Sequence, residues 1–306
     1  NTDRARIEKG GTIMKKLKAK NVKSKLSPLT IVMLVVLVLY SAFLLAMLLW
    51  AVLTALKKPL RFLNNTVGLP NPWYFGNIPY VLKNAEIIKE QGVVPFYEIV
   101  WNSLLYSVGC SIINTLVTCI VAYLCARYDC KFSKFVYALV LVVMVIPVVG
   151  NQTSELQMSI NLGLYDKMVG MLVMRASFLG IYFLVFYDMF KAVPMAFSEA
   201  AEIDGAGDFQ IMVRIFFPIA SNTFLTVLLI NFIGYWNNYQ VPMVYVPNHP
   251  TLAEYMFQIS TFSKYPFSKA PVQLAASLIL LLPAVAIFLA MHKRLLGNLS
   301  IGGVKG

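Results

Sequence analysis

The chain has 306 residues, 58% of them apolar, and 26 Lys and Arg against 14 Asp and Glu give it a formal net charge of +12. Its mean hydropathy of +0.69 lies outside the range of soluble globular domains. The composition therefore excludes a soluble enzyme or binding module and indicates an integral membrane protein. The basic residues lie beside apolar runs, at expected membrane flanks, which argues against nucleic-acid binding.

Six apolar runs are long enough to cross a membrane. A bilayer core of roughly 30 Å requires about 20 apolar residues in a helix. In chain order, the expected spans are Leu29–Leu56, Tyr97–Arg127, Lys134–Asn151, Val169–Lys191, Phe224–Val246 and Val272–His292. Pro147 and Pro242 interrupt two of them, which transmembrane helices tolerate. The predicted fold class is thus an all-α integral membrane protein with about six transmembrane helices.

These runs divide the chain into five parts, and charge predicts their sidedness. The parts are a basic N-tail at 1–28, a first transmembrane helix at 29–56, an extracytoplasmic segment at 57–96, a five-helix core at 97–293 and a C-tail at 294–306. Nine Lys and Arg lie between Arg4 and Lys25. With this tail inside, the cytoplasmic segments carry more Lys and Arg than the external ones. The positive-inside rule then predicts that both termini are cytoplasmic, as is the polar loop 191–214 within the core.

The loop 191–214 has the pattern of a short helix, a turn and a second helix. Pro194 suits the first turn of a helix, where its missing N–H has no partner to lose. An Ala- and Glu-rich helix is expected from Pro194 to Asp204. Gly205 can end it with a positive φ, and Asp208 is a favourable N-cap for a helix that enters the membrane. The sequence predicts a compact helical corner at the cytoplasmic face.

The same loop carries a spaced motif. Residues Glu199–Pro218 read EAA-x(3)-G-x(9)-I-x-x-P, with Gly205 as the glycine and Ile215 before the proline. This pattern resembles the EAA loop of the integral-membrane subunits of ABC importers, by which a permease contacts its ATPase. An ordinary amphipathic helix that connects two spans is the structural alternative, but it requires no fixed spacing.

Further segments resemble the carbohydrate-importing branch of this family. They are WNSLL at Trp101–Leu105, AYLCARY at Ala122–Tyr128, NLGLYD at Asn161–Asp166 and the terminal GGVKG at Gly302–Gly306. The combination is similar to the maltose-transporter permease subunit that ends in a short tail. Phe217 departs from the family's usual Leu, and the external segment Pro59–Pro95 is peculiar to this chain.

The resemblance implies a type I ABC importer permease fold in a bacterial cell membrane. It also implies a complex with a homologous second permease, two ATPase subunits and an extracytoplasmic solute-binding protein. The implied ATPase-coupling residues are Glu199, Ala200, Ala201, Ile203, Asp204, Gly205 and Pro218. The implied ATPase-contacting tail is Gly302, Gly303, Val304, Lys305 and Gly306. No catalytic, cofactor-binding or metal-binding residue is predicted, and ATP with magnesium is expected in the partner ATPase, since the sequence has no Walker-type phosphate loop.

Polar residues inside the spans are candidates for the translocation path. Asn231, Trp236 and Asn237 cluster in the fifth expected span, where amides and an indole face suit sugar hydroxyls and rings. Hydrogen bonding between helices is the alternative interpretation of the same residues. Arg175, within the fourth expected span, is expected to reach towards the surface or to pair with an acidic residue such as Asp166.

Two other functions remain as alternatives. An ion-coupled secondary transporter would show inverted repeats and carboxylates at mid-membrane, which this sequence lacks. An ABC importer for a solute other than a sugar fits the EAA loop equally well. A scaffold would not require the EAA spacing, and a membrane enzyme would require a catalytic constellation that is not apparent. The sequence does not identify the sugar or its chain length.

Overall fold

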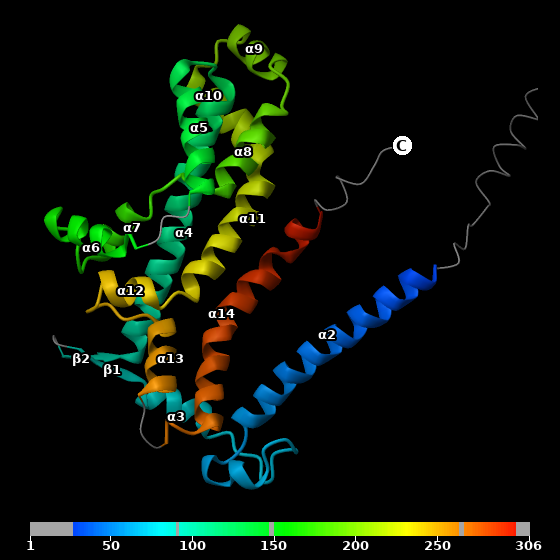
Figure 1. The fold of residues 1–306 in the computed structure, drawn as a ribbon, viewed down its shortest axis with the longest axis vertical. Coiled ribbons are helices and arrows are strands. Elements are labelled where there is room, and N and C mark those ends of the chain that lie inside the picture. Colours follow the sequence, from blue (N-terminus) through cyan, green and yellow to red (C-terminus); the bar gives the residue numbers. More distant parts are fainter. Residues whose placement is uncertain (1–26, 90–91, 147–149, 263–265, 298–306) are drawn as a thin grey trace, which may run out of the picture. The chain divides into compact units, whose positions relative to one another are not determined.

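A computed structural model describes residues 27–89, 92–146, 150–262 and 266–297 (Figure 1). The chain forms two compact units, residues 1–51 and 52–306. The described part of the first unit is most of helix α2 (Pro28–Ala55), which is apolar on every side, as suits contact with lipid. The N-tail and the predicted ATPase-contacting tail Gly302–Gly306 lie outside the described residues.

The second unit is helical apart from one hairpin. Its first elements are the 3₁₀ turn η1 (Pro59–Asn64), α3 (Asn77–Asn84) and the antiparallel strands β1 (Glu86–Lys89) and β2 (Gly92–Pro95). The remaining elements are α4 (Phe96–Arg127), α5 (Lys131–Val145), α6 (Gln152–Asn161), α7 (Met168–Met174), α8 (Ile181–Lys191), α9 (Ala196–Ile203), α10 (Asp208–Ile211), the π turn η2 (Met212–Phe216), α11 (Phe217–Trp236), α12 (Gln240–Tyr245), α13 (Leu252–Thr261) and α14 (Ala270–Gly297).

The predicted all-α membrane fold is confirmed, with four or five candidate spans among the described residues where the sequence indicated about six. Among the described residues, four helices are long and apolar enough to cross a membrane: α2, α4, the continuous run 208–236, and α14. The pair α8 and α9, bent by 66°, is a fifth candidate. Helix α5 ends at Val145, two residues before Pro147, because a residue that precedes proline avoids helical backbone.

Two expected spans have other bounds in the structure. The span Val169–Lys191 is broken, since α7 ends at Met174 and α8 begins only after Gly180, whose φ is 151°. The span Phe224–Val246 was placed too late along the chain. Its helical run begins at Asp208 and ends at Trp236. A hydropathy pattern marks only the most apolar residues. The observed helix also includes the more polar residues between the loop and Phe224.

The core near α9 is an aromatic cluster between α4, α8 and α11. Its fully or almost fully buried members include Tyr123, Phe183, Phe186, Phe190 and Phe216. The ring of Tyr123 lies 5.5 Å from that of Phe190 and 5.1 Å from that of Phe216, in edge-on and tilted arrangements that stabilise aromatic pairs. Rigid rings thus support the corner that the sequence predicted.

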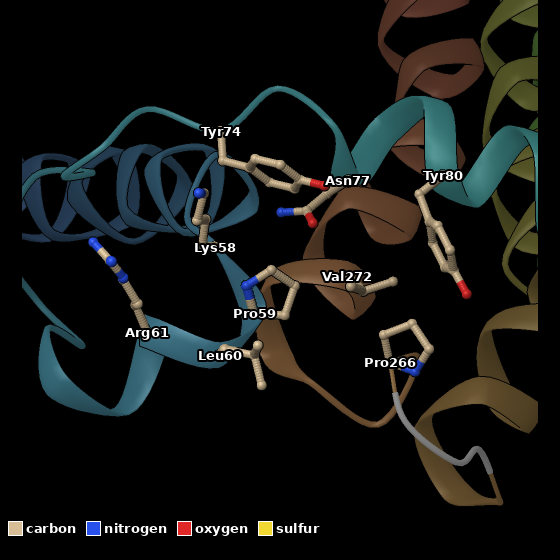
Figure 2. A pocket seen from close by; sticks show the side chains of 9 residues that line it. All are labelled: Lys58, Pro59, Leu60, Arg61, Tyr74, Asn77, Tyr80, Pro266 and Val272. Atoms are coloured by element: carbon tan, nitrogen blue, oxygen red, sulfur yellow. The ribbon is translucent and has the colours of Figure 1, made fainter.

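At the other end of the second unit, Asn77 of α3 caps the last residues of α2, which belong to this unit. The side-chain amide of Asn77, which is 2% exposed, donates to the carbonyl oxygens of Ala55 at 2.7 Å and Lys57 at 2.8 Å. Carbonyls at a helix end have no partner within the helix, so this amide serves as a cap from a distant segment. A cavity of about 720 Å³ lies beside it (Figure 2).

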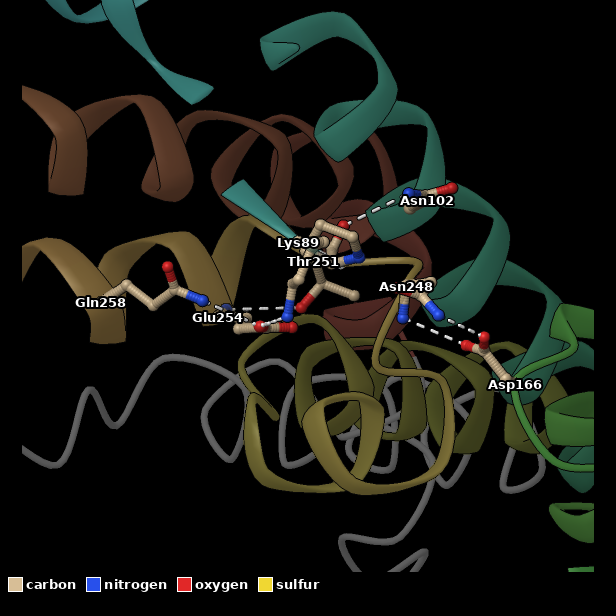
Figure 3. Close-up of polar contacts among 8 residues, drawn as sticks. Lys89, Asn102, Asp166, Asn248, Thr251, Glu254 and Gln258 are labelled. Carbon is tan, nitrogen blue, oxygen red and sulfur yellow. Dashed lines mark hydrogen bonds and ion pairs between the residues drawn. The ribbon is translucent and has the colours of Figure 1, made fainter. Parts of the chain in front are cut away.

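Polar contacts also fix the segment before α13 (Figure 3). Asp166 accepts hydrogen bonds from the backbone N–H of Asn248 at 3.0 Å and from its side-chain amide at 2.6 Å. Ser103 Oγ accepts from the N–H of Leu252 at 2.6 Å. Lys89 Nζ lies 2.5 Å from Oε1 of the fully buried Glu254. Residues far apart in sequence thus hold the hairpin, α4 and α13 together.

Candidate coupling loop and translocation surface

Helix α9 confirms the predicted short helix in loop 191–214. It covers Ala196–Ile203, inside the expected bounds Pro194–Asp204, and Glu199 lies in its first turn. A negative charge there is favourable beside the positive end of the helix dipole. The bend of 66° after α8 turns α9 away from the line of the span.

Gly205 ends α9 in the manner that the sequence predicted. Its φ is +81°, a conformation that costs other residues roughly 1–2 kcal/mol. The N–H of Gly205 donates to the carbonyl oxygen of Glu202 at 3.0 Å, and the N–H of Ala206 donates to that of Ala201 at 2.9 Å. Together these bonds form a Schellman motif, the pattern that closes many helix ends. The corner is therefore a defined turn with satisfied backbone groups.

The helix after the turn is capped differently from the prediction. Gly207 is the N-cap of α10, and Asp208 is its first residue. Asp208 still acts at this helix end, because its negative charge lies in the first turn. Its carboxylate also forms a hydrogen bond with Tyr128, which follows α4; burial, and then this hydrogen bond, raises the pKa of Tyr128 to about 12.

The outer side of α9 presents an apolar and acidic surface. Ile203 is 86% exposed and Phe197 is 53% exposed. Glu199 and Ala200 are exposed as well, as is Asp204 after the helix. Such large apolar side chains in the open, flanked by carboxylates, are typical of a surface that another protein covers.

The inner side of α9 packs on the protein's own core. Ser198 is buried, and Ala201 is half-buried against the aromatic cluster. Ala201, expected at the ATPase contact, therefore lies on the side that faces this subunit. The residues of the EAA motif, which are consecutive in the sequence, therefore lie on two different faces of α9. One face packs on this subunit's core and the other is exposed.

Arg127, the last residue of α4, attaches this corner to the core. Its Nη1 donates to the carbonyl oxygen of Val193 at 2.9 Å, and its Nη2 donates to Ser198 Oγ at 2.8 Å. The guanidinium carbon lies 4.4 Å from the centroid of the Phe216 ring, close enough for a cation–π interaction. In the sequence analysis, Arg127 was noted only as part of the AYLCARY segment. Its position as an arginine at the end of an apolar span was the feature that could have indicated a positioning role.

Pro218 follows the π turn η2 at the start of α11. Proline has no N–H to donate, and its ring clashes with the carbonyl four residues earlier. The wider π turn accommodates this, with the N–H of Phe217 donating to the carbonyl oxygen of Met212. Pro218 therefore shapes the helix that leads from the corner, while α9 carries the exposed surface.

The three candidate path residues have different surroundings. The Asn231 amide donates to Asn114 Oδ1 at 3.1 Å and to Thr115 Oγ1 at 3.0 Å, both on α4. Trp236 is 3% exposed, and its indole N–H donates to the carbonyl oxygen of Leu280 at 2.9 Å. These contacts favour the helix-packing interpretation for both residues.

Asn237 is the most accessible of the three. It is exposed and lines a groove of about 360 Å³ between α11 and α14, together with Ser277 and apolar residues such as Leu281 and Phe288. Its amide donates to the carbonyl oxygen of Ile233 at 2.9 Å. The amide oxygen of Asn237 and the Ser277 hydroxyl are polar groups in a largely apolar groove.

Arg175 pairs with a residue other than the expected Asp166. Its Nη2 lies 3.7 Å from Oε2 of Glu155, and its guanidinium carbon lies 5.7 Å from the centroid of the Tyr245 ring. Asp166 instead binds Asn248 across the loop, because both of its oxygens accept from that residue. Arg175 thus holds together segments beside the break between α7 and α8.

The described residues contain no group of three or more His, Cys, Asp or Glu that could hold a metal ion. The cysteines Cys110 and Cys119 are buried among the packed residues of α4. Cys130, by contrast, is exposed, and its sulfur accepts from the N–H of Ser133 at the start of α5.

A comparison with known families decides the class of this protein. Residues 117–295 match the family described as the binding-protein-dependent transport system inner membrane component. The match extends over more than half of the chain, from the middle of α4 almost to the end of α14. The chain belongs to this family.

Curated members of this permease family are similar along most of the chain. The diacetylchitobiose uptake permease NgcG of Streptomyces coelicolor is 24% identical and covers 87% of this chain and 86% of its own length. The melibiose/raffinose/stachyose import permease MelC of Bacillus subtilis is 27% identical over 65% of this chain and 77% of its own. The arabinooligosaccharide permease AraQ of B. subtilis is 23% identical over 78% and 81%.

A solved structure has the same fold. The structure of a bacterial ABC transporter involved in the import of the acidic polysaccharide alginate matches with a TM-score of 0.70 and 18% identity. It covers 87% of this permease and 95% of the matched chain. The predicted type I importer permease fold is therefore confirmed, and the protein is a multi-pass membrane component.

Proposed function

We propose that this chain is a permease subunit of an ATP-driven importer of sugars or oligosaccharides, coupled to its ATPase through α9. The observation that carries the proposal is the exposed face of α9, with Phe197, Glu199 and Ile203 on a helix closed by a Schellman turn at Gly205. Membership of the transport family and relatives named for saccharide transport support the substrate class. The particular saccharide is left open.

The proposed complex contains a homologous second permease, two ATPase subunits and an extracytoplasmic solute-binding protein. ATP and magnesium belong to the ATPase. The matched alginate transporter was also solved with a bound periplasmic protein, which supports the last of these partners. Both termini are placed in the cytoplasm on the charge distribution, and Gly302–Gly306 is proposed to contact the ATPase.

In the proposed mechanism, α9 transmits movement between subunits. ATP closes the ATPase dimer, and a cleft in one ATPase subunit moves the apolar side chains of α9. Because Arg127 and the turn at Gly205 join α9 to α4 and α10, the helices α4, α8 and α11 move with it. The path then opens outward, and hydrolysis resets it. A solute path beside Asn237 and the groove between α11 and α14 is part of this proposal.

Affinity purification from the native membrane, followed by mass spectrometry of the co-purifying chains, tests the proposal. We expect a second permease and an ATPase with a Walker motif in stoichiometric amounts, and a solute-binding lipoprotein or periplasmic protein in addition. Recovery of this chain alone, with solute transport that continues without ATP, would refute the proposal and favour an ion-coupled transporter. If the complex assembles but its binding protein retains a solute other than a saccharide, only the substrate class is wrong.

A further inference from the structure

The cavity beside the end of α2 has a cationic lining with no acidic residue. It measures about 720 Å³ and is shown in Figure 2. Its lining residues are Lys58, Pro59, Leu60, Arg61, Tyr74, Asn77, Tyr80, Pro266 and Val272. The cavity is thus formed by the segment after the first span, by α3 and by the start of α14.

Two of the cations near this cavity have no compensating charge. Lys58 and Arg61 are exposed, and neither forms an ion pair within the part of the chain that the structure describes. Lys58 Nζ lies 5.9 Å from the centroid of the Tyr74 ring. The neighbouring Lys57 is different, because it is buried and donates to the carbonyl oxygens of Asn65 at 2.9 Å and Thr66 at 3.0 Å. The free charge at the cavity therefore comes from Lys58 and Arg61.

The cavity lies at the level where two spans end. Helix α2 ends at Ala55, three residues before Lys58. Helix α14 begins at Ala270, between the lining residues Pro266 and Val272. The ends of transmembrane helices mark the boundary between the hydrocarbon core and the headgroups. Lys58 and Arg61 consequently lie at the depth of lipid headgroups.

The surroundings of the cavity have the composition of a membrane interface. Leu60 is 75% exposed, Leu63 76% and Val67 79%, while Trp73 and Phe75 are 53% and 65% exposed. Five exposed large apolar side chains within 16 residues are unfavourable in water and favour a segment that contacts lipid or another protein. Tryptophan at a span end is typical of the membrane interface. The segment from η1 to Phe75 thus suits insertion between headgroups.

We infer that this cavity binds the phosphate of an anionic phospholipid, such as phosphatidylglycerol, with Lys58 and Arg61 as its partners. A guanidinium can donate two hydrogen bonds to a phosphate, and the ammonium adds a point charge. The exposed apolar side chains around the cavity contact the acyl chains. The inference rests on the proposed function only for the assignment of this end to the outer leaflet; lipid binding itself requires no ATPase.

Native mass spectrometry of the purified complex, titrated with phosphatidylglycerol or phosphatidylcholine, tests this inference. We expect the wild-type complex to prefer phosphatidylglycerol. The double variant Lys58→Glu/Arg61→Glu should lose at least about thirtyfold in affinity for it, since removal of two cations alone costs that much and the variant also adds two negative charges. The matched control is Lys83→Glu, since Lys83 is exposed on α3 but does not line the cavity. The control should bind like the wild type.

A second variant guards against misfolding. Lys58→Arg/Arg61→Lys keeps both charges and should retain the preference for phosphatidylglycerol. Equal binding of the two lipids by the wild type, or unchanged binding by the double Glu variant, would overturn the inference. So would loss of affinity for the solute-binding protein with unchanged lipid binding, because the cavity would then be a protein contact. Lipid selectivity in a chain recovered without an ATPase would instead contradict the proposed function alone.

Discussion

At the scale of single residues, the polar side chains in the family-like segments are those that join distant parts of the chain. Arg127 of the AYLCARY segment binds the connection to α9, and Ser103 of the WNSLL segment binds the start of α13. Asp166 of the NLGLYD segment binds Asn248. The resemblance located these residues, but a sequence pattern does not specify their partners, which lie between 66 and 149 residues away. Their role is to position the elements that the apolar residues build.

Replacement of Arg127 by Met should loosen α9 without removing its exposed face. The change leaves the Val193 carbonyl and Ser198 Oγ without this donor and removes the cation beside Phe216. We expect about 2–4 kcal/mol lower stability, as for lost hydrogen bonds to a charged group. The ratio of solute transported to ATP hydrolysed should also fall. Thermal unfolding and paired transport and ATPase assays measure the two effects.

Lys134→Met is the control for Arg127→Met. Lys134 forms an ion pair with Asp129 at 3.0 Å, and both side chains are largely exposed. Exposed pairs of this kind contribute about 0–1 kcal/mol, so stability and coupling should remain close to wild type. Equal behaviour of the two variants would show that Arg127 has no positioning role.

The buried pair Lys89–Glu254 makes a second prediction at this scale. Oε1 of Glu254 accepts from Lys89 and from Gln258, while Oε2 has no hydrogen-bond partner among the described residues. Lys89→Met leaves a buried carboxylate without its counter-charge, which costs about 3–5 kcal/mol. The double variant Lys89→Met/Glu254→Leu should recover much of this loss, as a double-mutant cycle of thermal stabilities would reveal. Additive losses would contradict a coupled pair.

At the scale of elements, the short helix and its turn were predictable, while the lengths of the spans were not. Local chemistry determines α9: Ala and Glu favour the helix, and Gly205 adopts the positive φ that ends it. Span bounds depend on tertiary contacts. The break between Met174 and Ile181 is stabilised by Asn114 of α4, whose amide donates to the carbonyl oxygens of Arg175 and Ser177. Hydropathy does not report such contacts, so it predicted one continuous helix there.

The hairpin β1–β2 and the cap that Asn77 provides for α2 were also outside the reach of the sequence. Both lie in or beside the segment 57–96, which the sequence predicts to be external and which has no family-like motif. For the candidate site, the sequence identified the α9 surface but not its division into two faces. Ser198 and Ala201 turn inward because Arg127 and the aromatic cluster occupy that side. A division of this kind requires knowledge of what packs beneath the helix.

Gly205→Ala should destabilise the corner, since the added Cβ makes the positive φ unfavourable by roughly 1–2 kcal/mol. Gly207→Ala is the matched control two residues away. Gly207 has a φ of −76°, and a Cβ there would meet nothing within 4 Å. We expect reduced ATPase affinity and coupling for Gly205→Ala only, measured by titration of the purified ATPase onto the permease in nanodiscs. Gly205→Pro, a stronger change, should abolish transport while the subunit remains in the membrane.

At the scale of the whole molecule, the two ends of the second unit have different surfaces. The end with α9 presents Phe197, Ile203 and carboxylates, which suit a protein partner. The end with η1 presents cations and exposed apolar residues, which suit the membrane interface inferred above. In the proposed complex, the first end meets the ATPase and the second meets lipid and the extracytoplasmic space. A coupled permease requires two different ends, because the ATPase moves it from the cytoplasmic side and the solute arrives from the opposite side.

Deletion of Gly302–Gly306 tests the assembly that the family resemblance implies. We expect a weaker association with the ATPase, seen as a lower yield of ATPase in affinity purification of the truncated permease. Association with the second permease should not change, because the spans that meet it remain. ATPase recovery at the wild-type yield would remove the tail from the proposed interface.

The most direct test of the account is ATP-driven uptake by the complete complex in proteoliposomes, with the saccharide that its binding protein retains. Glu199→Lys reverses a charge on the exposed face of α9. Asp129→Lys, the control, reverses an exposed charge on the loop between α4 and α5. The account predicts that Glu199→Lys abolishes uptake while the permease pair still assembles, and that the control transports normally. Uptake by Glu199→Lys at the wild-type rate would contradict coupling through α9.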